Sequence, residues 1–205
     1  RRLKLLLIHF FLIIGNVWSQ DSIPEKFLND LPSYYEEYLN HNIPDKLIES
    51  YAQQNAYSKF NLTFYHKIYY NQPILVDYTR SILKQLLPNN EAIDDLEIYI
   101  TKSTQFNAFT IGDGSIFVNI AALAQMTSEA EFAFLLAHEY AHFELKHNEQ
   151  RYIKTNEKKR NKKLNVKELE EINAFSQNNE MASDSLAMVL ATSAGYDARA
   201  MDLLI

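Results

Sequence analysis

The stretch that most constrains the fold runs from Ser128 to His147 and reads SEAEFAFLLAHEYAHFELKH. It contains no Gly or Pro, and apolar residues recur through it with helical spacing. Ser128 is a favourable N-cap residue, and Glu131 stands three residues later, where a capping box has its acidic partner. The pattern predicts a helix that begins at Ser128.

Two histidines, His138 and His142, stand four residues apart inside this helix. Residues four apart are offset by about 40° around a helix, so both imidazoles leave one face. That arrangement suits two ligands of a tetrahedral zinc ion, with Glu139 beside them as the general base of a hydrolysis. The alternative is a chance motif at the polar edge of a core helix. The capped start and the apolar flanks favour the metal site.

A zinc hydrolase needs a third protein ligand. His147 lies about 140° around a continuous helix from His142, so we expect it to point away and to matter little for metal binding or hydrolysis. Glu180 lies on a second predicted helix, over 178–194, with Asp184 one turn further on the same face. We expect Glu180 to be the third ligand and Asp184 to accept the N–H of a ligand imidazole. The alternative for these two is a pair of exposed acids on a surface helix.

Composition limits the other functions open to the chain. Its 205 residues are 47% hydrophobic, which suits one domain with a sizeable core. The net charge of −6 argues against a nucleic-acid partner. Because the sequence has no Cys, disulfides, thiol nucleophiles and cysteine metal sites are excluded.

The N-terminus has the pattern of a secretory signal over residues 1–19. Three basic residues precede an apolar run from Leu5 to Ile14, and Ser19 is a suitable small residue for cleavage. The run is about half the length that spans a bilayer, so a retained membrane anchor is the weaker alternative. We expect an exported protein, periplasmic or extracellular, that begins at Gln20. Peripheral membrane association and oligomeric state are left open.

The remaining segments predict a small sheet between helices. We expect an irregular lead-in over 23–42 that holds one short helix. The lysine-rich segment 154–163 is expected to be a solvated helix or a mobile loop over the site. A last helix is expected to begin at Asp197. Between them we expect helices over 45–60, 73–87 and 120–126, a strand over 96–100, and a hairpin of 106–111 and 115–119 joined by Gly112-Asp113-Gly114.

Several segments in order resemble a known family. They are Asn107-Ala108-Phe109, the segment GDGSIFVN, the HEYAH motif, Glu180 to Asp184, and Gly195-Tyr196-Asp197. Together they resemble the zinc metallopeptidases of the CAAX prenyl endopeptidase and heat-shock membrane protease family, especially its smaller exported members. The resemblance covers residues 96–205, and residues 20–95 form a helical lead-in.

The resemblance implies an α+β, mostly helical, zincin-like domain with a small sheet before the HExxH helix. It implies a gluzincin site in which His138, His142 and Glu180 hold one Zn²⁺ per chain and Glu139 is the general base. It also implies that the strand bearing Asn107, Ala108 and Phe109 edges the cleft and binds polypeptide substrates by strand addition.

Two departures from the family pattern affect these expectations. Members usually have Ala before the Asp, whereas this chain has Ser183. Members also continue to a further His-Pro region, whereas this sequence ends at Ile205. We therefore expect a fragment that lacks part of the cleft.

We expect a zinc-dependent metalloendopeptidase that hydrolyses unfolded or mislocalised exported proteins. One alternative is a chaperone-like, zinc-organised binding module with little proteolytic activity. Another is a protease for lipid-modified peptides, which would need several membrane spans.

Overall fold

The computed structural model describes residues 45–65, 69–70, 72–159 and 166–203. The expected signal over 1–19 and the lead-in over 23–42 lie outside the described residues. The chain divides into two compact units, residues 1–66 and 67–205. In the described part of the first unit, α4 (Asp45–Phe60) forms as predicted and continues into a π-helical turn, Asn61–Tyr65. Among the described helices, none has the length and hydropathy of a membrane span.

A four-stranded sheet lies in the second unit. Its strands are β1 (Tyr69–Tyr70), β2 (Ile98–Thr101), β3 (Ala108–Thr110) and β4 (Ile116–Asn119), in the spatial order β1-β2-β4-β3. The predicted hairpin is present, because β3 pairs antiparallel with β4. β2 pairs parallel with β4, whose four residues are all buried. β3 is therefore an edge strand of this sheet.

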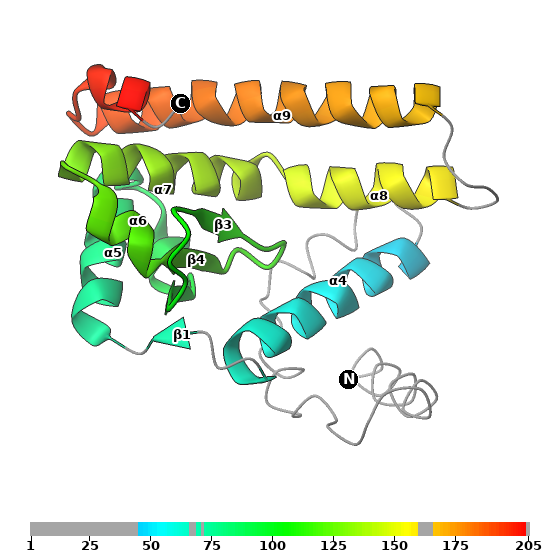
Figure 1. The fold of residues 1–205 in the computed structure, drawn as a ribbon, viewed down its shortest axis with the longest axis horizontal. Helices are drawn as coiled ribbons and strands as arrows, with labels where there is room; N and C mark the ends of the chain where they lie inside the picture. Colours follow the sequence, from blue (N-terminus) through cyan, green and yellow to red (C-terminus); the bar gives the residue numbers. More distant parts are fainter. Residues whose placement is uncertain (1–44, 66–68, 71, 160–165, 204–205) are drawn as a thin grey trace. The chain divides into compact units, whose positions relative to one another are not determined.

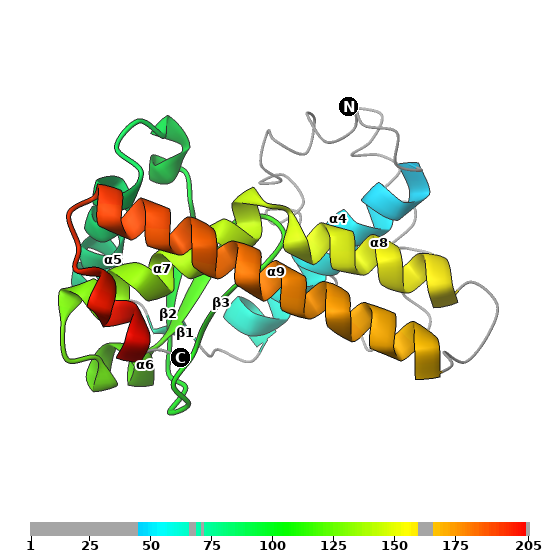
Figure 2. The same cartoon turned by 90° about the horizontal axis from the view of Figure 1, so that it is seen from above.

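Helices pack against the sheet and make up most of the described part of the second unit. Figure 1 shows α9 running beside α7 and α8, and the view from above in Figure 2 agrees. α7 packs on α9, α5 and β3, so it lies at the centre of the unit. The helices are α5 (Pro73–Leu86), α6 (Ile120–Gln125), α7 (Glu129–Glu144), α8 (His147–Lys159), α9 (Val166–Ser193) and the 3₁₀ segment η3 (Ala198–Leu203).

The core beneath α7 is built from aliphatic and aromatic side chains of the sheet and helices. Leu136 and Ala137 of α7 are fully buried in it. Burying an aliphatic side chain of this size contributes about 1.5–3 kcal/mol, so α7 is held firmly against the sheet. Other fully buried members are Ile82, Leu83, Ile100, Val118, Ala122, Ala133 and Ala191.

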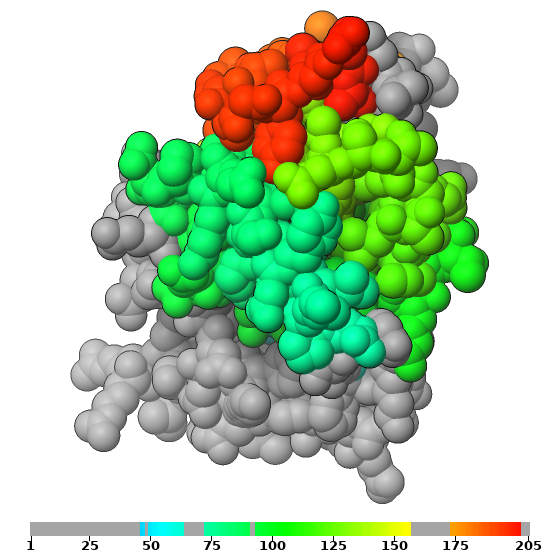
Figure 3. Space-filling view, turned by 90° about the vertical axis from the view of Figure 1, so that its left-hand side faces the viewer, coloured from blue at the N-terminus to red at the C-terminus, as the bar shows by residue number. Residues whose placement is uncertain are grey.

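The start of α7 has the predicted capping box. The side chain of Ser128 accepts a hydrogen bond from the N–H of Glu131 at 3.2 Å, and the Glu131 carboxylate accepts one from the N–H of Thr127 at 2.9 Å. Tyr196 adds a tertiary contact, since its hydroxyl donates to the Glu129 carboxylate at 3.0 Å. Figure 3 views this end of the unit, where α5, the start of α7 and the segment after α9 adjoin.

The structure differs from the sequence prediction in the bounds of several elements. α5, placed in the lead-in, packs on α7 and β2 within the compact unit 67–205. α9 begins at Val166, twelve residues before the predicted start, and the predicted last helix is a short 3₁₀ segment. α7 ends at Glu144, because Lys146 takes a left-handed conformation with φ 58°. Of the lysine-rich segment, the part up to Lys159 belongs to α8.

Candidate active site

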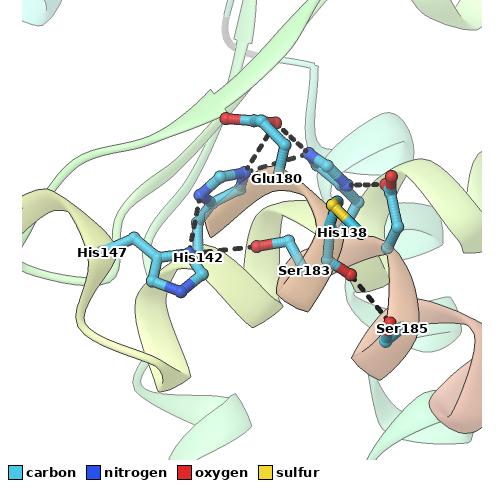
Figure 4. Close-up of polar contacts among 8 residues, drawn as sticks. His138, His142, His147, Glu180, Ser183 and Ser185 are labelled. Atoms are coloured by element: carbon cyan, nitrogen blue, oxygen red, sulfur yellow. Dashed lines mark hydrogen bonds and ion pairs between the residues drawn. The ribbon is translucent and has the colours of Figure 1, made fainter. Parts of the chain in front are cut away.

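Three predicted ligands come together between α7 and α9. His138 and His142 project from α7, and Glu180 projects from α9 (Figure 4). The Oε2 atom of Glu180 lies 3.4 Å from Nε2 of each histidine, and the two Nε2 atoms are 3.0 Å apart. Among the described residues, these side chains form the group whose donor atoms converge closely enough for one metal ion.

The donor geometry fits a tetrahedral ion of zinc size. Ligand atoms about 2.1 Å from a tetrahedral centre lie about 3.4 Å from one another. The three observed separations match this spacing to within a few tenths of an ångström. Burial, with the charge of neighbouring His138, lowers the pKa of His142 to about 4. A neutral imidazole is the form that binds a metal, so His142 is already in its ligating state.

Asp184 contacts the first of these histidines. Its Oδ1 atom lies 2.9 Å from Nδ1 of His138. The carboxylate is therefore placed to accept the proton of Nδ1, which leaves the lone pair of Nε2 directed at Glu180. A contact of this kind selects the tautomer of an imidazole that binds a metal.

His147 contacts the second ligand, and the prediction that it points away is wrong. Its Nδ1 atom lies 3.2 Å from Nδ1 of His142 and 3.1 Å from the hydroxyl oxygen of buried Ser183. The prediction assumed a continuous helix, whereas the chain turns at Lys146 and begins α8 at His147. His147 still lies outside the metal-ligating group, because it meets the far nitrogen of the His142 ring.

Glu139 is the predicted general base, and it is buried beside these ligands. Burial raises the pKa of Glu139 to about 8, a hydrogen bond from the Thr110 backbone lowers it, and the charge of Glu180 raises it further. Burial thus favours the protonated form, and the positive charge of a metal ion beside it would favour the carboxylate that a general base needs. The Thr110 contact also ties the carboxyl group to the edge strand β3.

A cleft of about 160 Å³ opens onto this group. Glu139, His142 and Glu180 line it, and β3 contributes Phe109. Sequence reasoning missed the other lining side chains, since no spacing rule links them to the HExxH motif: Thr110, Asn148, Arg151, Ser176 and Asn179. Asn148 holds the edge strand, because its Nδ2 donates to the Thr110 carbonyl at 3.1 Å.

The three predicted substrate-binding residues lie differently. Phe109 lines the cleft, and Ala108 is buried on the edge strand. Asn107 is exposed just before β3, and its backbone carbonyl accepts a hydrogen bond from the N–H of Asn119, the last residue of β4. Its backbone carbonyl is thus used within the sheet.

The fold and this group of side chains define a metal-dependent peptide hydrolase. The family model for peptidase family M48 matches residues 77–205, and the chain belongs to this family. M48 peptidases are metal-dependent, so the chain is a metalloendopeptidase that acts on polypeptides. No curated protein matches the chain in a sequence search. The family match begins within α5, which agrees with the packing of that helix on α7.

Proposed function

We propose that this protein is an exported zinc endopeptidase that cleaves extended segments of unfolded or mislocalised polypeptides. The observation that carries the proposal is the position of Glu139. Its carboxyl group lies beside the group formed by His138, His142 and Glu180, and it also accepts a hydrogen bond from the backbone of Thr110 on β3. A substrate strand along β3 would therefore lie next to the general base.

The hydrogen-bond register of β3 favours a substrate in extended conformation. Asn107 and Ile111 use their backbone groups toward β4, accepting from Asn119 and donating to Ser115. Because backbone groups alternate along a strand, those of Ala108 and Thr110 face the open edge. Thr110 is occupied there by Glu139 and Asn148. Ala108 is thus placed to pair with a substrate strand, and pairing of this kind places little demand on substrate side chains.

The residues divide the chemistry between them. His138, His142 and Glu180 would hold a zinc ion, whose positive charge would polarise the scissile carbonyl and lower the pKa of acids beside it. Glu139 takes a proton from the attacking water as the oxygen bonds to the carbonyl carbon. When the C–N bond breaks, Glu139 passes that proton to the departing amine. Burial of Glu139 excludes competing water from this proton transfer.

The dimensions of the cleft also support an extended substrate. Pockets for compact ligands usually hold about 300 Å³ or more, whereas this cleft has about 160 Å³. It accommodates one or two side chains of a chain that continues along the strand edge. Chains without stable structure meet this requirement more easily than folded proteins do.

The test compares digestion of an unfolded protein with digestion of the same protein when folded. Reduced, alkylated ribonuclease serves as the unfolded substrate and native ribonuclease as the folded one. We expect cleavage of the unfolded form alone, loss of cleavage after chelation, and recovery on adding zinc. Glu139→Gln should abolish cleavage, and Glu144→Gln, on the same helix but outside the cleft, should not.

Two outcomes would contradict the proposal. Cleavage that survives chelation would exclude the metal mechanism. Zinc-dependent retention of unfolded ribonuclease without any cleavage would favour the chaperone-like binding module. The burial of the Glu139 carboxyl group beside the ligands favours the protease, since a binding module has no need of a buried acid there.

Export is tested separately. A mature protein that begins at Gln20 is supported by the basic residues at the N-terminus, the apolar run after them and the small residue Ser19. Fractionation of cells that express the full gene, followed by mass spectrometry of the N-terminus, decides between cleavage and a retained anchor. An N-terminus upstream of the apolar run in a membrane fraction would contradict cleavage of the signal.

A further inference from the structure

We propose that His147 is a positioning residue that orients the metal ligand His142, and that Ser183 holds His147 in place. This inference rests on the proposed metal site and adds to it a partner for the second histidine. It reverses the expectation from helical periodicity that His147 has no part in metal binding.

The first step is the assignment of protons on the two rings. Nε2 of His142 faces Glu180 at 3.4 Å, and this nitrogen needs a free lone pair in order to bind a metal. The proton of the neutral ring is then on Nδ1, 3.2 Å from Nδ1 of His147. A hydrogen bond between these atoms requires His147 Nδ1 to accept. The proton of neutral His147 is therefore on its own Nε2.

Ser183 meets the same nitrogen from α9. Its hydroxyl oxygen lies 3.1 Å from Nδ1 of His147, and the side chain is fully buried. With Nδ1 of His147 as the acceptor, the hydroxyl is a donor and shares the single lone pair of that nitrogen with the N–H of His142. Figure 4 shows the resulting row from Glu180 through His142 to His147 and Ser183.

The backbone around residue 146 is what brings His147 to this position. Lys146 has a φ of 58°, a conformation that residues other than Gly seldom adopt. Two contacts hold the turn: the N–H of Lys146 donates to the Phe143 carbonyl at 2.9 Å, and the Gln150 side chain donates to the Leu145 carbonyl at 2.9 Å. Without this turn, His147 would continue α7 and leave its opposite face.

The two ligand histidines therefore have different partners. His138 is paired with a carboxylate, Asp184, whereas His142 is paired with a neutral imidazole. A partner of either kind selects the tautomer, and removal of such partners usually costs 10–100-fold in metal affinity. We expect His147→Ala to lower zinc affinity by about this factor.

The test measures zinc affinity by competition with a chromophoric chelator, together with the visible absorption spectrum of the Co²⁺-loaded protein. His147→Ala should weaken zinc binding and change the Co²⁺ spectrum. His147→Asn, whose Oδ1 can occupy the place of Nδ1 as an acceptor, should restore both toward wild type. Ser185→Ala is the control: it removes an exposed hydroxyl two residues beyond Ser183 that donates to the Met181 carbonyl and touches neither His147 nor a ligand, and it should leave the Co²⁺ spectrum unchanged.

A measurement on the wild-type protein covers the case in which His147→Ala fails to fold. Nitrogen-15 NMR of the zinc-loaded protein should show the proton on Nδ1 of His142 and on Nε2 of His147. A proton on Nδ1 of His147, or wild-type zinc affinity in folded His147→Ala, would overturn the proposal. Failure of the wild-type protein to bind zinc would instead overturn the proposed metal site, so the two failures are distinguishable.

Discussion

His138 and Asp184, 46 positions apart in sequence, lie with Nδ1 and Oδ1 2.9 Å from each other. The pair joins the HExxH helix α7 to α9 at the point where Glu180 enters the metal-ligating group. Asp184, one turn beyond Glu180 on α9, thus both joins two helices and orients the His138 imidazole.

We predict that Asp184→Ala weakens zinc binding about 10–100-fold, because His138 loses the acceptor that selects its tautomer. Asp184→Asn should fall between wild type and Asp184→Ala, since its amide oxygen still accepts but carries no charge. Chelator competition measures both affinities. Equal affinity in all three proteins would show that His138 needs no partner.

We predict opposite metal contents for two glutamate variants. Glu139→Gln should retain about one zinc per chain and lose hydrolysis, because an amide fills the same space but cannot take a proton. Glu180→Ala should lose both zinc and hydrolysis, because it removes a ligand. Elemental analysis beside a peptide-cleavage assay separates the two. A zinc-free Glu139→Gln protein would place Glu139 among the ligands instead.

We predict that Gly114→Ala destabilises the protein more than Gly195→Ala does. Both glycines have left-handed backbones, with φ values of 83° and 90°, so both substitutions carry a strain of about 1–2 kcal/mol. At Gly114 the new methyl group would also lie 3.1 Å from Leu96 and from the Phe143 ring, whereas at Gly195 it meets open space. The difference between the two unfolding free energies, measured in urea, reports the contact between the hairpin turn and α7. Equal losses would exclude it.

The capping box at Glu131 gives a pH-dependent prediction. Hydrogen bonds from Thr127 lower the pKa of Glu131 below its ordinary value of 4.5. A carboxyl group with a lowered pKa in the folded state stabilises the fold above its unfolded pKa, and this stability is lost as the pH falls through the folded pKa. Unfolding of wild type should therefore become easier below about pH 4.5 to a greater extent than unfolding of Glu131→Gln. Parallel pH profiles for the two proteins would contradict the contact.

We predict that substrates pair with Ala108 by main-chain hydrogen bonds. N-methylation of a peptide substrate at alternate residues near the scissile bond should then reduce cleavage, because a methylated amide cannot donate to the edge strand. Methylation one residue further along, where the amide faces away, serves as the control. The same loss at every position would indicate a general steric effect and not strand pairing.

Much of the site follows from the sequence because its geometry is local. His138 and His142 share a face since a helix repeats every 3.6 residues, and Ser128 begins that helix because its side chain caps Glu131. Glu180 and Asp184 share a face of α9 for the same reason as the histidines. The need for a third ligand placed these two short-range patterns in one site, the family resemblance agreed, and the structure brings the side chains together.

The tertiary structure decided what no local rule contains. Residue 146 is Lys and not Gly, so the sequence carries no local signal for a left-handed backbone there. Lys146 nevertheless takes that conformation, which ends α7 and turns His147 back toward His142. Residues just after this turn are held by two distant segments. On β3 the Thr110 carbonyl accepts a hydrogen bond from the Asn148 side chain, and on α9 the Ser183 hydroxyl contacts His147. Periodicity fixes the direction of a side chain only while the helix continues, and whether it continues depends on packing against distant segments. The metal ligands could therefore be predicted from sequence, and the surroundings of the second ligand could not.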